Sequence, residues 1–264
     1  MLEEEKSVML FHRSYRTLPG SLLQFTVEFI CFTMLFSSIT LYYYPQITFF
    51  MCAITQQAIS PFFPPNAIGI SAVDYISVTN RIAQIFFLDL PNQTPTWLFS
   101  LINLLVCLFF ILVLPHVKRA KPLVILGILI SIIHLVSSCF LFLIPNAFPY
   151  NTVDYSKLYM QQEINIWFFV PVVMGLAILP LPSSLASKTI TMIASYLTAL
   201  VFGTVRYAVF LFILAKFSII YMAIFFFVLG PLMDYTYIVG IYSWHISRQS
   251  TMMEGDFKLW KWPF

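Results

Sequence analysis

The sequence predicts an all-α integral membrane protein: a bundle of about six transmembrane helices with one external re-entrant or interfacial segment. Hydrophobic residues make up 60% of the chain and charged residues only 9%. So few charges would not cover the surface of a water-soluble domain. The apolar residues are also gathered into runs long enough to cross a bilayer, and the basic residues between these runs lie mainly on one side of them.

Six runs approach the roughly 20 apolar residues that a helix needs to cross the hydrocarbon core. Five are continuous, and the sixth contains Gly230-Pro231 near its middle. The predicted spans are residues 22–44, 97–115, 123–144, 164–181, 189–214 and 217–244. The sequence shows no linker long enough to separate a water-soluble domain. We therefore expect one integral membrane domain over residues 1–264.

The positive charge predicts the orientation of the six spans. Ten of the 14 Lys and Arg residues fall on the side that includes both chain ends, and only Arg81, Lys157 and Lys216 fall on the other side. Basic residues are retained on the cytoplasmic side of a membrane. We therefore expect both termini in the cytoplasm, with a cytoplasmic segment over 1–21 and a cytoplasmic tail over 246–264. The expected location is the plasma, or inner, membrane.

Residues 45–95 are expected on the external side. The run 47–63 is apolar but contains Gln56 and Gln57. If this run alone crossed the membrane, the basic residues of 118–121 would move to the outside. We therefore expect 47–63 to form a re-entrant or interfacial segment rather than a further span.

The second half of this region has apolar residues at helical spacing between Val73 and Leu90. This pattern is typical of an amphipathic helix on the outer leaflet, or of a loop helix packed on the bundle. A third interpretation has both pieces crossing as a hairpin. It gives eight spans and keeps the same orientation.

Ionisable side chains inside the predicted spans are the candidate functional residues, because each costs free energy unless it is paired or hydrated. They form a candidate intramembrane polar site of Arg206, Asp234, Glu28 and His134. Arg206 lies about 25 Å along its helix from the cytoplasmic start of the span, near the outer leaflet. It either extends its charge to the headgroups or binds an anionic group there. His134 either bonds a neighbouring helix or takes part in proton transfer.

The position of Asp234 depends on how the chain passes Gly230-Pro231. If residues 217–244 form one span, Asp234 lies across the bilayer from Arg206. If the last helix begins at this Gly-Pro step, Asp234 lies near Arg206 and is its expected partner. A Gly-Pro step inside a span breaks the backbone hydrogen-bond ladder, so both alternatives stay open at this point.

The sequence predicts no catalytic residue, cofactor, metal ion or nucleic-acid partner. It contains no complete metal-binding or nucleotide-binding motif. The four cysteines, which show no CxxC spacing, are expected to be small apolar fillers: Cys31, Cys52, Cys107 and Cys139.

The C-terminal third of the chain resembles the exosortase/archaeosortase family. Members of that family carry an Arg in a penultimate apolar helix, followed later by a His-Asp step shortly before a Gly. Arg206 in Gly-Thr-Val-Arg-Tyr resembles this Arg, and Asp234 and Gly240 match the Asp and the Gly, with Met233 at the His position. The family's nucleophilic Cys has no counterpart in the stretch 165–175.

The resemblance implies a member that has lost two of its three catalytic positions, so covalent thiol catalysis cannot run. We therefore expect a non-catalytic integral membrane subunit of a larger cell-envelope assembly. The composition implies the lipid bilayer as one partner. The family association implies a second, a membrane protein such as a glycosyltransferase or export component of extracellular polysaccharide synthesis.

Two alternatives remain. The first is a membrane-embedded enzyme acting on a lipid-linked or peptide substrate, with Arg206 holding a phosphate or carboxylate. The second is a small transporter that uses Glu28, His134 and Asp234.

Overall fold

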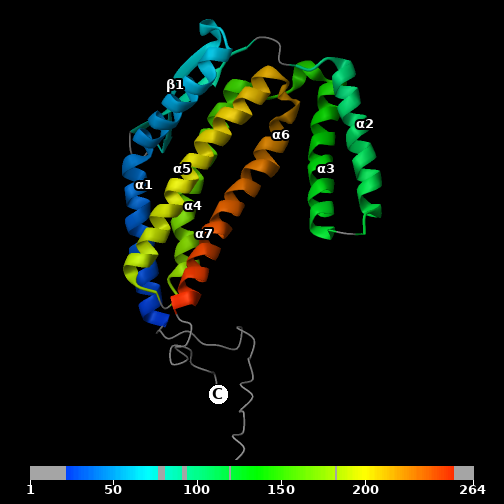
Figure 1. Cartoon of the computed structure of the whole chain (residues 1–264). Helices are drawn as coiled ribbons and strands as arrows, with labels where there is room; N and C mark the ends of the chain where they lie inside the picture. The colour runs from blue at the N-terminus through cyan, green and yellow to red at the C-terminus, as the bar shows by residue number, and fades with distance from the viewer. Residues whose placement is uncertain (1–21, 77–80, 91–93, 119, 182, 253–264) are drawn as a thin grey trace, which may run out of the picture.

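The computed structural model of the chain describes residues 22–76, 81–90, 94–118, 120–181 and 183–252. Six helices are long and apolar enough to cross a membrane (Figure 1). The predicted helical membrane bundle is therefore confirmed. The segment 1–21 and the end of the tail, 253–264, lie outside the described residues. The orientation in the membrane stays a prediction.

The helices differ widely in length. The long ones are α1 (Leu22–Ile59), α2 (Trp97–Val113), α3 (Lys121–Leu143), α4 (Thr152–Ile178), α5 (Leu185–Lys216) and α7 (Gly230–Met252). The segment before α7 consists of short helical turns: η7 (Ile219–Tyr221), α6 (Met222–Ile224) and the π-helix η8 (Phe225–Leu229). Further 3₁₀ turns are η2 (Ser60–Phe62), η3 (Pro65–Ala67), η5 (Leu114–His116) and η6 (Pro145–Ala147).

Polar side chains cap three of these helices. Thr96 accepts the backbone N–H of Phe99 at the start of α2, and Ser184 accepts that of Ser187 at the start of α5. Asn151 caps α4 in a reciprocal capping box with Asp154. Such caps satisfy N–H groups that have no partner within the helix, and they define where each helix begins.

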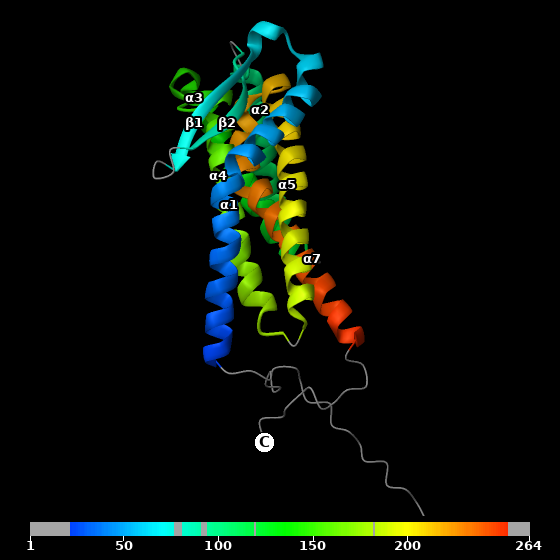
Figure 2. The same ribbon diagram turned by 90° about the vertical axis from the view of Figure 1, so that its left-hand side faces the viewer.

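The main bundle consists of α1, α4, α5 and α7, which run side by side (Figure 2). Large side chains fill the space between these helices, and Tyr44, Tyr155, Trp167 and Tyr207 are almost completely buried. The core is continuous with the side chains under the two-stranded sheet. The bundle is therefore a packed body that can hold polar groups away from lipid.

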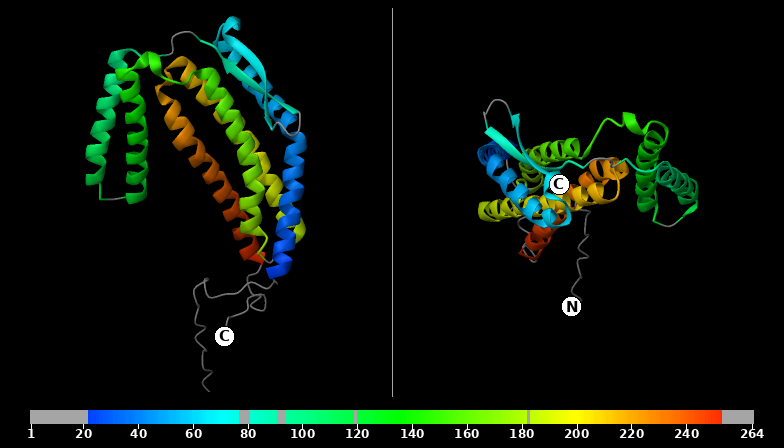
Figure 3. Two further views of the ribbon diagram at one scale, coloured as in Figure 1. Left: turned by 180° about the vertical axis from the view of Figure 1, so that it is seen from behind. Right: turned by 90° about the horizontal axis from the view of Figure 1, so that it is seen from above.

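The α2–α3 hairpin stands apart from this bundle. Its two helices pack on each other, and α3 meets the rest of the molecule through η7 and α6 (Figures 1 and 3). Leu141 and Leu123 lie on the same face of α3, about five helical turns apart. Leu141 is 1% exposed and Leu123 is 69% exposed. The rest of the molecule therefore covers this face of α3 at Leu141 and leaves it open at Leu123.

The structure corrects the expectations for residues 45–95. Helix α1 continues through Pro45 to Ile59 without a break, so 47–63 is not a separate re-entrant segment. The stretch after it forms an antiparallel hairpin of β1 (Ile68–Ile76) and β2 (Arg81–Leu88) instead of an amphipathic helix. The apolar spacing did not distinguish a helix from a strand. A strand that is buried on one face has apolar residues at alternate positions, and some of these are also four residues apart, as in a helix.

This β-hairpin packs along the end of α1 (Figure 2). A two-stranded sheet leaves edge carbonyl groups unpaired, which is costly away from water. Three alternate residues of β2 have these groups satisfied by helix side chains. The donors are Cys52 to Gln84, Tyr207 to Phe86, and Thr152 to Leu88. Each of the three donors comes from a different helix, so the edge of the sheet is bound to α1, α5 and α4.

Candidate functional site

Arg206 is the centre of a buried polar cluster. It is 3% exposed, so it does not extend its charge to the headgroups. Its Nε donates to the hydroxyl of Tyr159 at 2.8 Å. Its Nη1 donates to the carbonyl of Gly230 at 2.7 Å and to Oδ1 of Asp234 at 2.9 Å. Its Nη2 pairs with Oε1 of Glu163. We call Arg206, Tyr159, Glu163 and Asp234 the Arg206 cluster.

Helix α7 brings Asp234 to this cluster. The chain is helical on both sides of Gly230, but the preceding turn is the π-helix η8, and α7 begins at Gly230. Pro231 has no backbone N–H, so one carbonyl group of the preceding turn loses its helical donor. Arg206 also donates to the carbonyl of Gly230, the residue at which α7 begins. Of the two alternatives left open by the sequence, the structure shows the one that pairs Asp234 with Arg206.

Helix α4 supplies Tyr159 and Glu163, which were not among the residues predicted from the sequence. They are four residues apart and so lie on one face of the helix. Glu163 is 1% exposed, although the predicted fourth span, 164–181, begins only after it. The capping box of Asn151 and Asp154 is the sequence signal that would have found it, because it starts α4 at Thr152.

Tyr159 connects the cluster to the backbone of α5. Its hydroxyl donates to the carbonyl of Gly203 at 2.8 Å and accepts from Arg206. Its ring stacks on Tyr207, with 4.8 Å between the ring centroids. The cluster thus ties α4, α5 and α7 together at one level of the bundle.

The cluster contains two carboxylates and one guanidinium, all buried. Oδ2 of Asp234 is buried without a hydrogen bond of regular geometry among the described residues, and the buried hydroxyl of Tyr237 lies near this carboxyl group. With both carboxyl groups ionised, the cluster carries one negative charge too many. A buried charge without a partner costs several kcal/mol, so this site favours binding one further positive charge or proton.

Glu28 lies next to Lys188, which is about 27 Å along α5 from Arg206. It accepts a hydrogen bond from Gln24 at 2.8 Å, and Lys188 Nζ is 4.0 Å from its Oε2. Lys188 itself donates to the carbonyl of Leu179 at 2.7 Å, at the end of α4. These contacts are typical of a group that closes the end of a helix bundle.

His134 lies in the α2–α3 hairpin. Its Nε2 is 3.0 Å from the amide oxygen of Asn103 on α2. Its ring stacks on Tyr221 of η7, with 5.3 Å between the centroids. His134 therefore joins α2, α3 and η7. The four candidate residues fall into three places, and only Arg206 and Asp234 meet.

Within the described part of the chain, none of the residues that touch Arg206 carries a thiol. The stretch 165–175, which the resemblance aligns with the nucleophile turn, lies inside continuous α4. Cys52 donates to a backbone carbonyl, and Cys107 and Cys139 lie in the α2–α3 hairpin. Among the described residues, no group of three or more His, Cys, Asp or Glu side chains has a metal-binding arrangement. Comparisons with protein-family models, curated proteins and solved structures find no match to the chain.

Proposed function

We propose that the chain is a non-catalytic integral membrane subunit that assembles with a second membrane protein. The observation that carries this proposal is the separation of the α2–α3 hairpin from the main bundle. The face of α3 that is buried at Leu141 is open at Leu123. Helices in a membrane associate by close packing rather than by the hydrophobic effect, and this uncovered face offers a transmembrane helix of a partner such a surface.

The geometry of the Arg206 cluster supports a structural role over catalysis. All three guanidinium nitrogens donate to groups of the chain itself. A phosphate or carboxylate substrate would have to displace Glu163 or Asp234 and leave that carboxylate unpaired in the bundle. Such a displacement costs more than it gains when the buried partner is left alone. This geometry therefore disfavours the enzyme in which Arg206 holds an anionic substrate.

The class of partner rests on the resemblance to the exosortase/archaeosortase family. That resemblance suggests a cell-envelope assembly, with a membrane glycosyltransferase or export component of extracellular polysaccharide synthesis as the second protein. The subunit would then supply its membrane-embedded contact surface and leave the chemistry to its partner.

Photo-cross-linking in native membranes tests the proposal. We would introduce one photoreactive side chain at Leu123 and, as a matched control, at Ile125. The two residues are 69% and 67% exposed, but they lie on different faces of α3. The probe at Leu123 should capture one membrane protein that also co-purifies with the unmodified chain, and the probe at Ile125 should capture mainly lipid.

Two results would contradict the proposal. The first is capture of lipid alone from both positions, because α3 would then face only the bilayer. The second is full enzymatic turnover by the purified chain without any partner. A glycosyltransferase among the captured proteins would further support the proposed assembly, and a protein of another class would remove that part of the proposal.

A further inference from the structure

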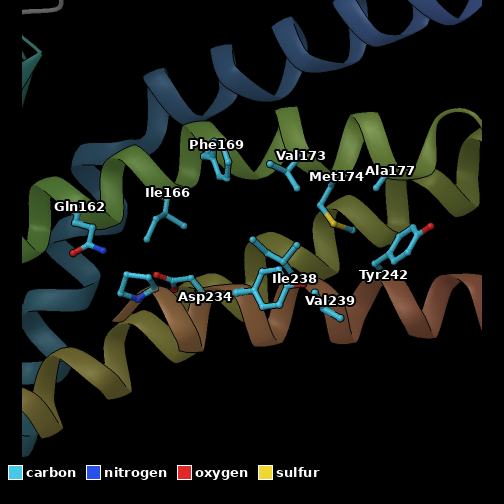
Figure 4. A pocket seen from close by; sticks show the side chains of 12 residues that line it. Gln162, Ile166, Phe169, Val173, Met174, Ala177, Asp234, Ile238, Val239 and Tyr242 are labelled. Carbon is cyan, nitrogen blue, oxygen red and sulfur yellow. The ribbon is translucent and has the colours of Figure 1, made fainter. Parts of the chain in front are cut away.

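A cavity of about 380 Å³ lies between α4 and α7, next to the Arg206 cluster (Figure 4). Asp234 and Gln162 lie at one end, and Ala177 and Tyr242 lie at the other. From Asp234 to Tyr242 the cavity follows α7 for about 12 Å. It is therefore an elongated apolar space with a polar end.

The lining identifies the shape and polarity of a suitable occupant. Between its ends the cavity is lined by apolar side chains, among them Ile166, Val173 and Ile238. On its rim, Phe169 is 57% exposed and Tyr235 is 67% exposed. These exposed rim residues leave the cavity accessible from the lipid. A single alkyl chain can enter from the bilayer and lie along α7.

The polar end identifies the head group. Asp234 is 7% exposed, and its Oδ1 is already bonded to Arg206. Its Oδ2 and the nearby hydroxyl of Tyr237 are both buried without a hydrogen bond of regular geometry among the described residues, so the Asp234 side chain must turn toward the cavity to meet a head group. With both carboxyl groups ionised, the surplus negative charge of the Arg206 cluster is complementary to a protonated amine, which also donates hydrogen bonds. A carboxylate or phosphate head group would add to the surplus.

We propose that this cavity binds an amphiphile with one alkyl chain and a protonated amine, with the ammonium group on Asp234 and the chain along α7. The ammonium would bring the Arg206 cluster to zero net charge without displacing Arg206 from either carboxylate. The amide of Gln162 is placed to contribute a second polar contact. This inference goes beyond the proposed partner and stands independently of it.

Binding of dodecylamine by the full chain in phosphatidylcholine nanodiscs tests the proposal, with empty nanodiscs to subtract partitioning into lipid. Dodecanol and dodecanoate serve as competitors with the same chain and no positive charge. We expect saturable binding of dodecylamine and competition by dodecanol that is about tenfold weaker or more, because a charge-assisted hydrogen bond is lost. Equal competition by dodecanol, or no saturable binding, would overturn the proposal.

Two variants test the head-group end and the alkyl-chain end of the cavity separately. Asp234→Asn should remove the preference for the amine over the alcohol. Ala177→Trp should fill the far end of the cavity and reduce binding of both, without touching the Arg206 cluster. Leu176→Trp is the matched control, because Leu176 is 52% exposed and does not line the cavity. If Asp234→Asn does not fold, the Ala177→Trp variant still decides: unchanged dodecylamine binding there would overturn the proposal.

Discussion

Gly203 of α5 lies directly against the carboxylate of Glu163 on α4. A Cβ atom at Gly203 would lie 2.5 Å from Oε2 of Glu163. A Cβ at that distance would force the Glu163 carboxylate to move, so the absence of a Cβ leaves this carboxylate room in the position where it pairs with Arg206. The glycine is therefore a steric condition for the ion pair.

Gly203→Ala is expected to push Glu163 away from Arg206 and to lower the free energy of unfolding by about 2–4 kcal/mol. Thermal unfolding of the purified chain in detergent would measure the change. Gly240→Ala is the matched control, because no heavy atom lies within 4 Å of the added Cβ. It should leave stability unchanged or raise it by up to about 1 kcal/mol. Equal melting temperatures for the two variants would contradict this account.

Arg206→Leu should cost about 3–5 kcal/mol, because it leaves Glu163 and Asp234 buried without a cation. Arg206→Lys should recover only part of this, because one ammonium group does not reproduce the guanidinium fork. Protein yield and melting temperature in detergent would report both effects. Wild-type values for Arg206→Leu would show that the cluster contributes nothing to stability.

A triple variant provides the compensation test for the same cluster. Adding Glu163→Gln and Asp234→Asn to Arg206→Leu removes both uncompensated charges. It should therefore be more stable than Arg206→Leu alone, since coupled residues are not additive. If the added changes lower stability further, the loss in Arg206→Leu comes from packing and not from unpaired charge.

Tyr207→Phe should loosen the β-hairpin by leaving the carbonyl of Phe86 without its donor. An unsatisfied buried carbonyl costs about 1–3 kcal/mol. Hydrogen–deuterium exchange of peptides covering β2 should become faster, with little change in α7. Tyr150→Phe, at a tyrosine that is 48% exposed, is the control and should leave exchange in β2 unchanged.

Thiol labelling in intact cells would test the orientation. In a background without the four native cysteines, Lys118→Cys should be protected from an impermeant reagent and Asn146→Cys should react. Both positions are exposed in the structure, so accessibility depends on the side of the membrane. The positive-inside rule is the basis of this expectation, and labelling at 118 from outside would reverse the predicted topology.

The six-helix architecture could be predicted from the sequence because long apolar runs are a strong and local signal. The β-hairpin could not, because its stability depends on distant donors such as Tyr207 and Thr152. No window of sequence around residues 68–88 contains these partners. The extension of α1 through Pro45 was missed for a related reason: a transmembrane helix tolerates a proline when surrounding groups satisfy the backbone groups that it frees.

The candidate site was predictable in part. Arg206 and Asp234 were found because charges inside apolar runs are unusual. Glu163 was not found, because the first turns of α4 are rich in polar residues, and such a composition is typical of a loop between spans. Tyr159 and Glu163 face Arg206 because of how α4, α5 and α7 pack together. The local sequence of α4 does not show which helices this face will meet.

The unequal lengths of the helices have a consequence for the surrounding lipid. Helix α2 has 17 residues and α5 has 32, which correspond to about 26 Å and about 48 Å of helix. A hydrocarbon core of about 30 Å matches the first and is much shorter than the second. Such hydrophobic mismatch is relieved by tilt or by local changes in bilayer thickness. Helix α5 must therefore tilt, or the bilayer must thicken around it, whereas α2 needs neither.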